Sequence, residues 1–173
     1  MADPSLFDFM RIPVAALVAV DNRPLHFAMQ PYHHLIRLVH VATMGAFFGG
    51  IGLLDLRLMG WRGTVPLKPF ADHVLPWLYV TFAVAVLTGV ALFAYDPVHV
   101  GSHAYFAPKL ALIGLGLANA LLFHRTAYLR ALAAVNALPV AARAAGAVSL
   151  VVWTAVVVCS SLNVEGVPKV LLR

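Results

Sequence analysis

Charge is scarce in this sequence. Only 11% of the 173 residues are charged and 62% are hydrophobic, whereas about 25% of an ordinary soluble domain is charged. The twelve Lys and Arg stand singly at the ends of apolar runs and form no basic stretch, so the formal charge of +5 indicates membrane topology and not nucleic-acid binding. We therefore expect the chain to be surrounded by the lipid bilayer and not by water.

Other absences exclude whole classes of chemistry. The single cysteine, Cys159, rules out an intrachain disulfide and a metal cluster built on cysteine. The sequence contains no H-E-x-x-H, no G-x-S-x-G, no P-loop and no G-x-G-x-x-G. An independent hydrolase or nucleotide enzyme is therefore not expected, and the chain is not predicted to be an enzyme on its own.

Long apolar stretches are what the sequence does contain. A helix of about 20 residues crosses a hydrocarbon core of about 30 Å. Four apolar stretches reach that length, at roughly 34–58, 74–95, 105–126 and 142–162. They are continuously apolar and do not alternate as barrel strands do, so they predict helices. We expect an all-α fold in which residues 31–173 form one four-helix transmembrane bundle.

Two prolines lie near the predicted starts of these helices. Pro76 and Pro108 are expected in first helical turns, where a missing N–H costs little.

The N-terminal segment, residues 1–30, has a different character. Its apolar run, 12–20, is too short to span a bilayer. Asp3 and Asp8 precede Arg11, so the segment lacks the basic start of a signal peptide. We expect it to be retained and to lie in the membrane interface as a helix.

The basic residues predict an orientation. Six flank the spans on the side of the first and third loops: Arg57, Arg62, Lys68, Arg125, Arg130 and Arg143. Four lie on the opposite side: Arg11, Arg23, Lys169 and Arg173. This excess predicts that the first and third loops are cytoplasmic and that both termini are outside.

Small residues indicate where helices could approach each other. Gly45 and Gly49 form a G-x-x-x-G, Gly114 pairs with Ala118 on the third predicted helix, and alongside the first motif lie Ala42, Ala46 and Gly50. Such spacing favours close backbone contact. Alternatively, these glycines reflect only the general abundance of glycine in membrane helices.

Ionisable residues at membrane depth are the first candidates for function. An outer group lies on the first predicted helix, in or near the second loop, and one turn into the third helix; its members are His33, His34, Arg37, His40, His99, His103 and Lys109. A neutral imidazole is a common haem-iron ligand, and Arg37 or Lys109 could neutralise haem propionates or hydrogen-bond a quinone. Alternatively, the cations extend to the headgroups and His40 hydrogen-bonds a neighbouring helix.

An inner group comprises Asp55, Arg57, His73 and His124. A carboxylate beside His124 would orient its ring, as carboxylates do for metal-bound histidines. Alternatively, Asp55 forms a structural ion pair with Arg57 or with Arg125.

Depth limits which histidines can share an iron. His40 and His124 should be roughly 20–25 Å apart along the membrane normal. The pairs left open for haem are therefore His40 with His103 and His73 with His124, or one histidine with a ligand from a partner subunit.

The strings HLIRLVHVATMGAFFGGIGLLDLRLMG, LPWLYVTFAVAVLTGVALF and LANALLFHR resemble a bacterial family of four-helix membrane proteins known mainly as a domain of unknown function. The matching positions are His40, Asp55 to Gly60, Leu87 to Gly89 and Asn119 to His124. His73 and His103 do not belong to the pattern. There is a looser similarity to four-helix b-type cytochromes. The resemblance implies the bacterial inner membrane, in which both termini, placed outside by the basic residues, would be periplasmic.

Three functional hypotheses follow. The first is a membrane subunit that binds b-type haem or quinone for electron transfer and anchors a membrane or periplasmic redox partner. In the haem version, His40 and His124 are iron ligands at two different levels of the membrane. The second is a structural or assembly subunit without a cofactor, packing on a larger complex or on copies of itself. The third, ranked lower because the chain shows no internal repeat, is a small-solute or metal-ion carrier.

Overall fold

Every regular element among the described residues is helical. The structure, a computed structural model, describes residues 8–61, 66–134 and 137–165. A short 3-10 helix, η1 (Asp8–Met10), is followed by the α-helices α1 (Val14–Val20), α2 (Arg23–Met29), α3 (His33–Met59), α4 (Leu67–Tyr95), α5 (Pro97–Gly101), α6 (Phe106–Thr126), α7 (Tyr128–Leu132) and α8 (Val140–Glu165). The predicted all-α fold, with short helices before the bundle, is confirmed.

Four of these helices are long and apolar enough to cross a bilayer. They are α3, α4, α6 and the Val140–Asn163 part of α8, with mean hydropathies of 1.5, 2.1, 1.7 and 2.0. All four predicted spans are found, and the chain is a multi-pass membrane protein.

The start of α4 differs from the prediction. The helix begins at Leu67, before the apolar run, because its first turns are amphipathic: Leu67 and Ala71 are buried, while Lys68 donates to the Asp72 carboxylate at 2.7 Å on the exposed side. Pro76 therefore lies inside the helix and not in its first turn. Pro108 does lie in the first turn of α6, as predicted.

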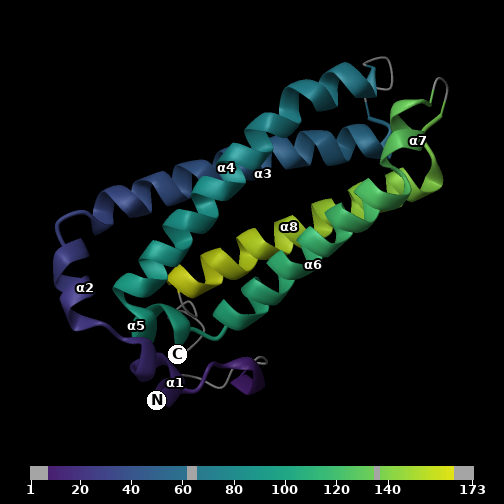
Figure 1. Ribbon diagram of the computed structural model, residues 1–173. Coiled ribbons are helices and arrows are strands. Elements are labelled where there is room, and N and C mark those ends of the chain that lie inside the picture. Colours follow the sequence, from purple (N-terminus) through teal and green to yellow (C-terminus); the bar gives the residue numbers. More distant parts are fainter. Residues whose placement is uncertain (1–7, 62–65, 135–136, 166–173) are drawn as a thin grey trace.

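The bundle consists of two helical hairpins joined along one seam (Figure 1). The main contacts connect α3 with α4, α6 with α8, and α3 with α8. The four long helices are therefore arranged in the order α4, α3, α8, α6. At one end, the Phe93 and Phe106 rings stack with centroids 5.4 Å apart and also bring the end of α4 against the start of α6.

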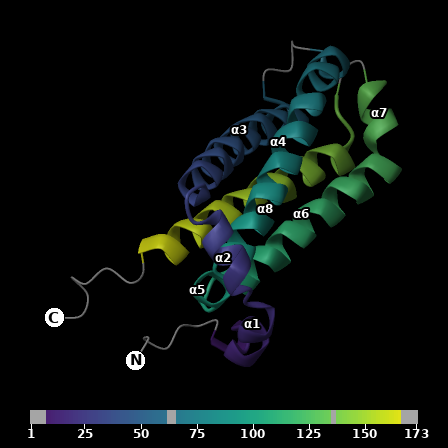
Figure 2. The same cartoon turned by 60° about the vertical axis from the view of Figure 1, so that its left-hand side comes forward.

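The short helices lie at the two ends of the bundle. Figures 1 and 2 show α1, α2 and α5 together at one end, which we call the α5 end, and α7 at the other, the α7 end. At the α5 end, Leu17 of α1 is buried and packs on Gly101 of α5, where an added Cβ would lie 2.5 Å from Leu17 Cδ2. Arg11 Nη1 also donates to the Ser102 carbonyl at 2.8 Å.

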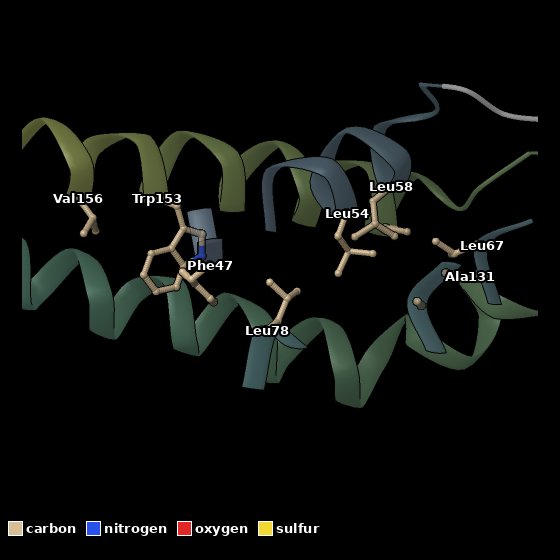
Figure 3. Close-up of a cluster of buried hydrophobic side chains, with 10 residues drawn as sticks. Phe47, Leu54, Leu58, Leu67, Leu78, Ala131, Trp153 and Val156 are labelled. Carbon is tan, nitrogen blue, oxygen red and sulfur yellow. The ribbon is translucent and has the colours of Figure 1, made fainter. Parts of the chain in front are cut away.

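The core is a cluster of buried apolar side chains between α3, α4 and α8, with Ala131 of α7 at its edge (Figure 3). The Trp153 ring of α8 packs edge-on against Phe47 of α3 and Phe82 of α4, with centroid distances of 4.8 and 5.9 Å. The aromatic contacts therefore join three of the four long helices at one level.

Glycines permit the closest helix contacts. Of the four glycines that the sequence suggested, Gly50 takes part, since a Cβ added there would lie 2.9 Å from Leu78 Cδ2 of α4. A Cβ added at Gly45, Gly49 or Gly114 would meet nothing within 4 Å. At Gly146 of α8, an added Cβ would lie 2.9 Å from the backbone oxygen of Asp55, and at Gly116 of α6 it would lie 3.0 Å from the Trp153 ring. Close approach at glycines therefore occurs where α8 meets α3 and α6, and also where α3 meets α4.

We expect Gly146→Ala to destabilise the bundle, because the new methyl group would push the backbones of α3 and α8 apart. Overpacking of this kind typically costs about 1–3 kcal/mol. Gly45→Ala, which adds the same methyl in open space on α3, is the matched control and should change the free energy of unfolding by less than about 0.5 kcal/mol. Unfolding in mixed detergent micelles measures both, and equal effects of the two variants would contradict the packing described here.

Candidate functional site

The His40 side chain of α3 is a polar group at membrane depth with two defined contacts to a neighbouring helix. It is half-buried and stands seven residues from the start of the helix, about 10 Å along its axis. Its Nδ1 lies 2.9 Å from the Ala85 carbonyl oxygen and 3.0 Å from Thr88 Oγ1, both on α4. These two contacts fix the ring between α3 and α4.

The local sequence of α4 provides the space and the acceptors that hold the His40 ring. Gly89 lies under the ring, and a Cβ added there would be 3.0 Å from His40 Cε1. The Thr88 hydroxyl donates back to the Val84 carbonyl at 2.6 Å, so its oxygen remains free to accept from the histidine. The L-T-G string of the second span thus provides both an acceptor and the space for the imidazole.

These contacts define the tautomer of His40. A backbone carbonyl can only accept, so Nδ1 must carry the hydrogen that it shares with Ala85 and Thr88. In the neutral ring, Nε2 then has a free lone pair. This arrangement, with Nδ1–H bound to a carbonyl, is also the one that orients histidines toward a metal or a substrate.

Lys109 of α6 is the second polar residue near this place. It is partly buried, and its Nζ lies 5.3 Å from the centroid of the Phe106 ring. Its ammonium is close enough for its charge to act on His40 and on Cys159. Among the ion pairs of the described residues, none gives Lys109 a carboxylate partner. A partly buried cation, without a carboxylate partner among the described ion pairs, thus acts on His40 through its charge.

The other predicted outer residues have different surroundings. Arg37 is exposed. The His103 ring packs edge-on against His99, with centroids 5.0 Å apart, and among the described residues it makes no contact with His40. Within the described residues, Lys109 is therefore the predicted outer residue whose charge acts on His40, and His103 has a different neighbour.

The inner residues separate into buried and exposed ones. Asp55 and Arg57 are 2% and 8% exposed, whereas His73 and His124 are exposed. The hydrogen-bond partner of the Asp55 carboxyl is Ser149 of α8. Neither the expected ion pair of Asp55 with Arg57 or Arg125 nor a contact of Asp55 with His124 occurs among the described interactions.

His124 instead stacks on Tyr128 of α7, with ring centroids 4.5 Å apart and planes at 20°. Partial burial, and then the nearby Asp72 carboxylate, raise the pKa of Tyr128, so its hydroxyl is uncharged at neutral pH. No group of three or more metal-ligating side chains occurs in the described parts of the chain. Arg62, counted with the loop charges, lies outside the described residues, as do Lys169 and Arg173.

Sequence reasoning missed a histidine stack at the α5 end. Tyr95 lies between His26 and His33, with ring centroids 4.4 and 4.9 Å away and planes nearly parallel to both. His26 Nδ1 also hydrogen-bonds the Tyr95 carbonyl oxygen at 2.7 Å. This stack holds α2 against the end of α4. No sequence motif predicts this stack, because its three residues come from three different helices.

Comparisons with protein-family models, curated proteins and solved structures find no match to the chain. The functional assignment consequently depends on the geometry of the site.

We expect 15N NMR of histidine-labelled protein in micelles to find His40 as the neutral tautomer with hydrogen on Nδ1, because Ala85 can only accept. The chain has eight histidines, and His40→Gln identifies the signal by removing it. A hydrogen on Nε2 of the neutral ring would contradict the described hydrogen bonds.

Proposed function

We propose that this protein is a membrane subunit that binds the headgroup of a quinone between His40 and Lys109, takes part in electron transfer, and anchors a redox partner. The observation that supports this most is the fixed His40 ring, whose Nδ1 is engaged with α4 and on which the charge of the Lys109 ammonium acts at membrane depth. Ionisable groups in this position are costly and are kept where they serve function.

The two side chains suit the two oxygens of a quinone. Lys109 can donate a hydrogen bond to a carbonyl oxygen, and its positive charge favours electron density on that oxygen. The Nε2 atom of neutral His40 can accept a hydrogen bond from a hydroxyl of the reduced form and hold its proton. A bound quinone supplies two-electron, two-proton chemistry, and its apolar tail is soluble in the surrounding lipid.

A b-type haem fits the same residues less completely. His40 could bind iron through Nε2, since its Nδ1 is already engaged with Ala85. The second ligand predicted at this depth, His103, is engaged with His99. His124 is exposed at the α7 end. A six-coordinate haem would therefore need a ligand from a partner subunit, and we assign no step to haem.

Membership of the bacterial four-helix family, and with it a place in the inner membrane, is part of the same proposal. The orientation proposed from the basic residues puts the α7 end in the cytoplasm and the α5 end, with both termini, outside. His40 and Lys109 would then lie in the periplasmic half of the bilayer, within reach of a membrane or periplasmic redox partner.

We expect Lys109→Gln to weaken binding of a short-tailed quinone by roughly 10–100-fold, because a charge-assisted hydrogen bond contributes about 1.5–3 kcal/mol. Equilibrium dialysis of the purified protein in detergent measures this affinity. Lys68→Gln, the same change at an exposed position, is the control and should bind normally. Absence of binding by the unaltered protein, or equal binding by both variants, would favour the cofactor-free assembly subunit.

Any b-type haem that copurifies is expected to depend on His40 and not on His124. Glutamine can keep a hydrogen bond to Ala85, but it is a poor replacement for imidazole on iron, so His40→Gln should fold and lose the reduced-minus-oxidised spectrum. His124→Gln and Asp55→Asn should keep it, because neither residue lies at the His40 level. Full haem content in His40→Gln would exclude His40 as a ligand.

The orientation has a direct test. An alkaline phosphatase fused after Arg173 should be active, because that enzyme needs the periplasm, and a green fluorescent protein fused there through the general secretion route should be dark. The opposite pair of results would reverse the proposed topology and place His40 in the cytoplasmic half.

A further inference from the structure

A second polar site is enclosed between α3 and α8, away from His40. Asp55 of α3 is 2% exposed and Ser149 of α8 is 7% exposed. The backbones approach each other at this point because α8 has Gly146 opposite Asp55: a Cβ there would lie 2.9 Å from the Asp55 backbone oxygen. Asp55 is therefore held inside the bundle by protein on the α8 side.

The Asp55 carboxyl group has one hydrogen-bond partner, not several. Its side chain bonds to Ser149, whereas its Oδ2 is buried without any partner. The bond to Ser149 therefore falls on Oδ1. A carboxylate has about four acceptor positions on two oxygens, so an ionised Asp55 would leave most of its negative charge unsolvated.

Within the part of the chain that the structure describes, no positive charge compensates that carboxyl. Arg57, on the same helix, is buried and has interactions of its own. From α8, Arg143 is exposed; from α4, Asp72 and His73 are exposed. None of these charges acts on Asp55. Burying an ionised carboxylate without a counter-charge costs far more than burying a neutral acid.

We propose that Asp55 is a proton-binding site, a membrane-embedded carboxylic acid whose proton lies on Oδ1 and is donated to the Ser149 hydroxyl oxygen. Oδ2 is then a carbonyl oxygen, and an acceptor of that kind is tolerated without a partner more readily than a donor. The neutral acid thus accounts for both the single hydrogen bond and the unpartnered oxygen.

The site is near one aqueous side. Asp55 stands four residues before the end of α3 at Met59, about 6 Å along the helix axis, so its proton exchanges with water at the α7 end. When Asp55 takes up a proton, an O–H bond forms on Oδ1, and when it releases the proton to water, that bond breaks. His40 is fifteen residues away on the same helix, about 22 Å, and the proposal does not depend on quinone binding there.

Infrared difference spectroscopy of the full chain in nanodiscs at neutral pH tests the proposal. Subtracting the spectrum of Asp55→Asn from that of the unaltered protein should leave the C=O band of one protonated carboxylic acid per chain, and this band should shift in D2O. Asp72→Asn, at an exposed aspartate, is the matched control and should remove only carboxylate bands. A difference spectrum with carboxylate bands alone would overturn the proposal.

A second variant tests the proton's acceptor. Ser149→Ala should move the carboxylic acid band without removing it, because the acid loses its hydrogen-bond partner but remains buried. The alternative is that Asp55 binds a small metal cation such as sodium instead of a proton. Repeating the measurement in sodium and in potassium salts tests this alternative. A carboxylate band that depends on sodium would show a metal-cation site in place of a proton site.

Discussion

The contact between α3 and α8 is the interaction on which the whole bundle depends. Each of these helices has a flanking partner, α4 or α6, and among the described residues their own seam is the main junction between the two hairpins. Aromatic contacts of α4 with Trp153 and with Phe106 add to it. In lipid there is no hydrophobic force between helices, so close packing and a few hydrogen bonds must hold such a seam. Gly146 lets the backbones meet, and the Asp55–Ser149 bond crosses at the same place.

One helix, α3, carries both polar sites, and its two neighbours give them different properties. At the level of His40, α4 offers a carbonyl, a hydroxyl and a glycine, which fix one edge of the ring and leave Nε2 open. At the level of Asp55, α8 closes over the carboxyl and leaves no opening to a large ligand. The first geometry suits a cofactor that diffuses in lipid, and the second suits only a proton or another very small cation.

The individual spans were predictable because the length of an apolar run is a local property of the chain, and it decides whether a segment can satisfy its backbone in lipid. Hydropathy alone failed at the start of α4. There, the buried Leu67 and Ala71 share a helix with charged residues, and tertiary packing extends the helix past the limit of the apolar run. Pro76 is an interior residue for that reason.

By itself, the sequence determined the number of spans and identified His40, Lys109 and Asp55 as polar residues at membrane depth. It could not determine their partners. These helices are apolar on nearly all sides, so no hydrophobic face tells how each one is rotated in the bundle. Rotation is decided by where two backbones can approach, as at Gly146, and that contact pairs Asp55 with Ser149, a residue 94 positions later in the chain. Only the tertiary structure could therefore decide between an ion pair, a histidine partner and an isolated buried acid.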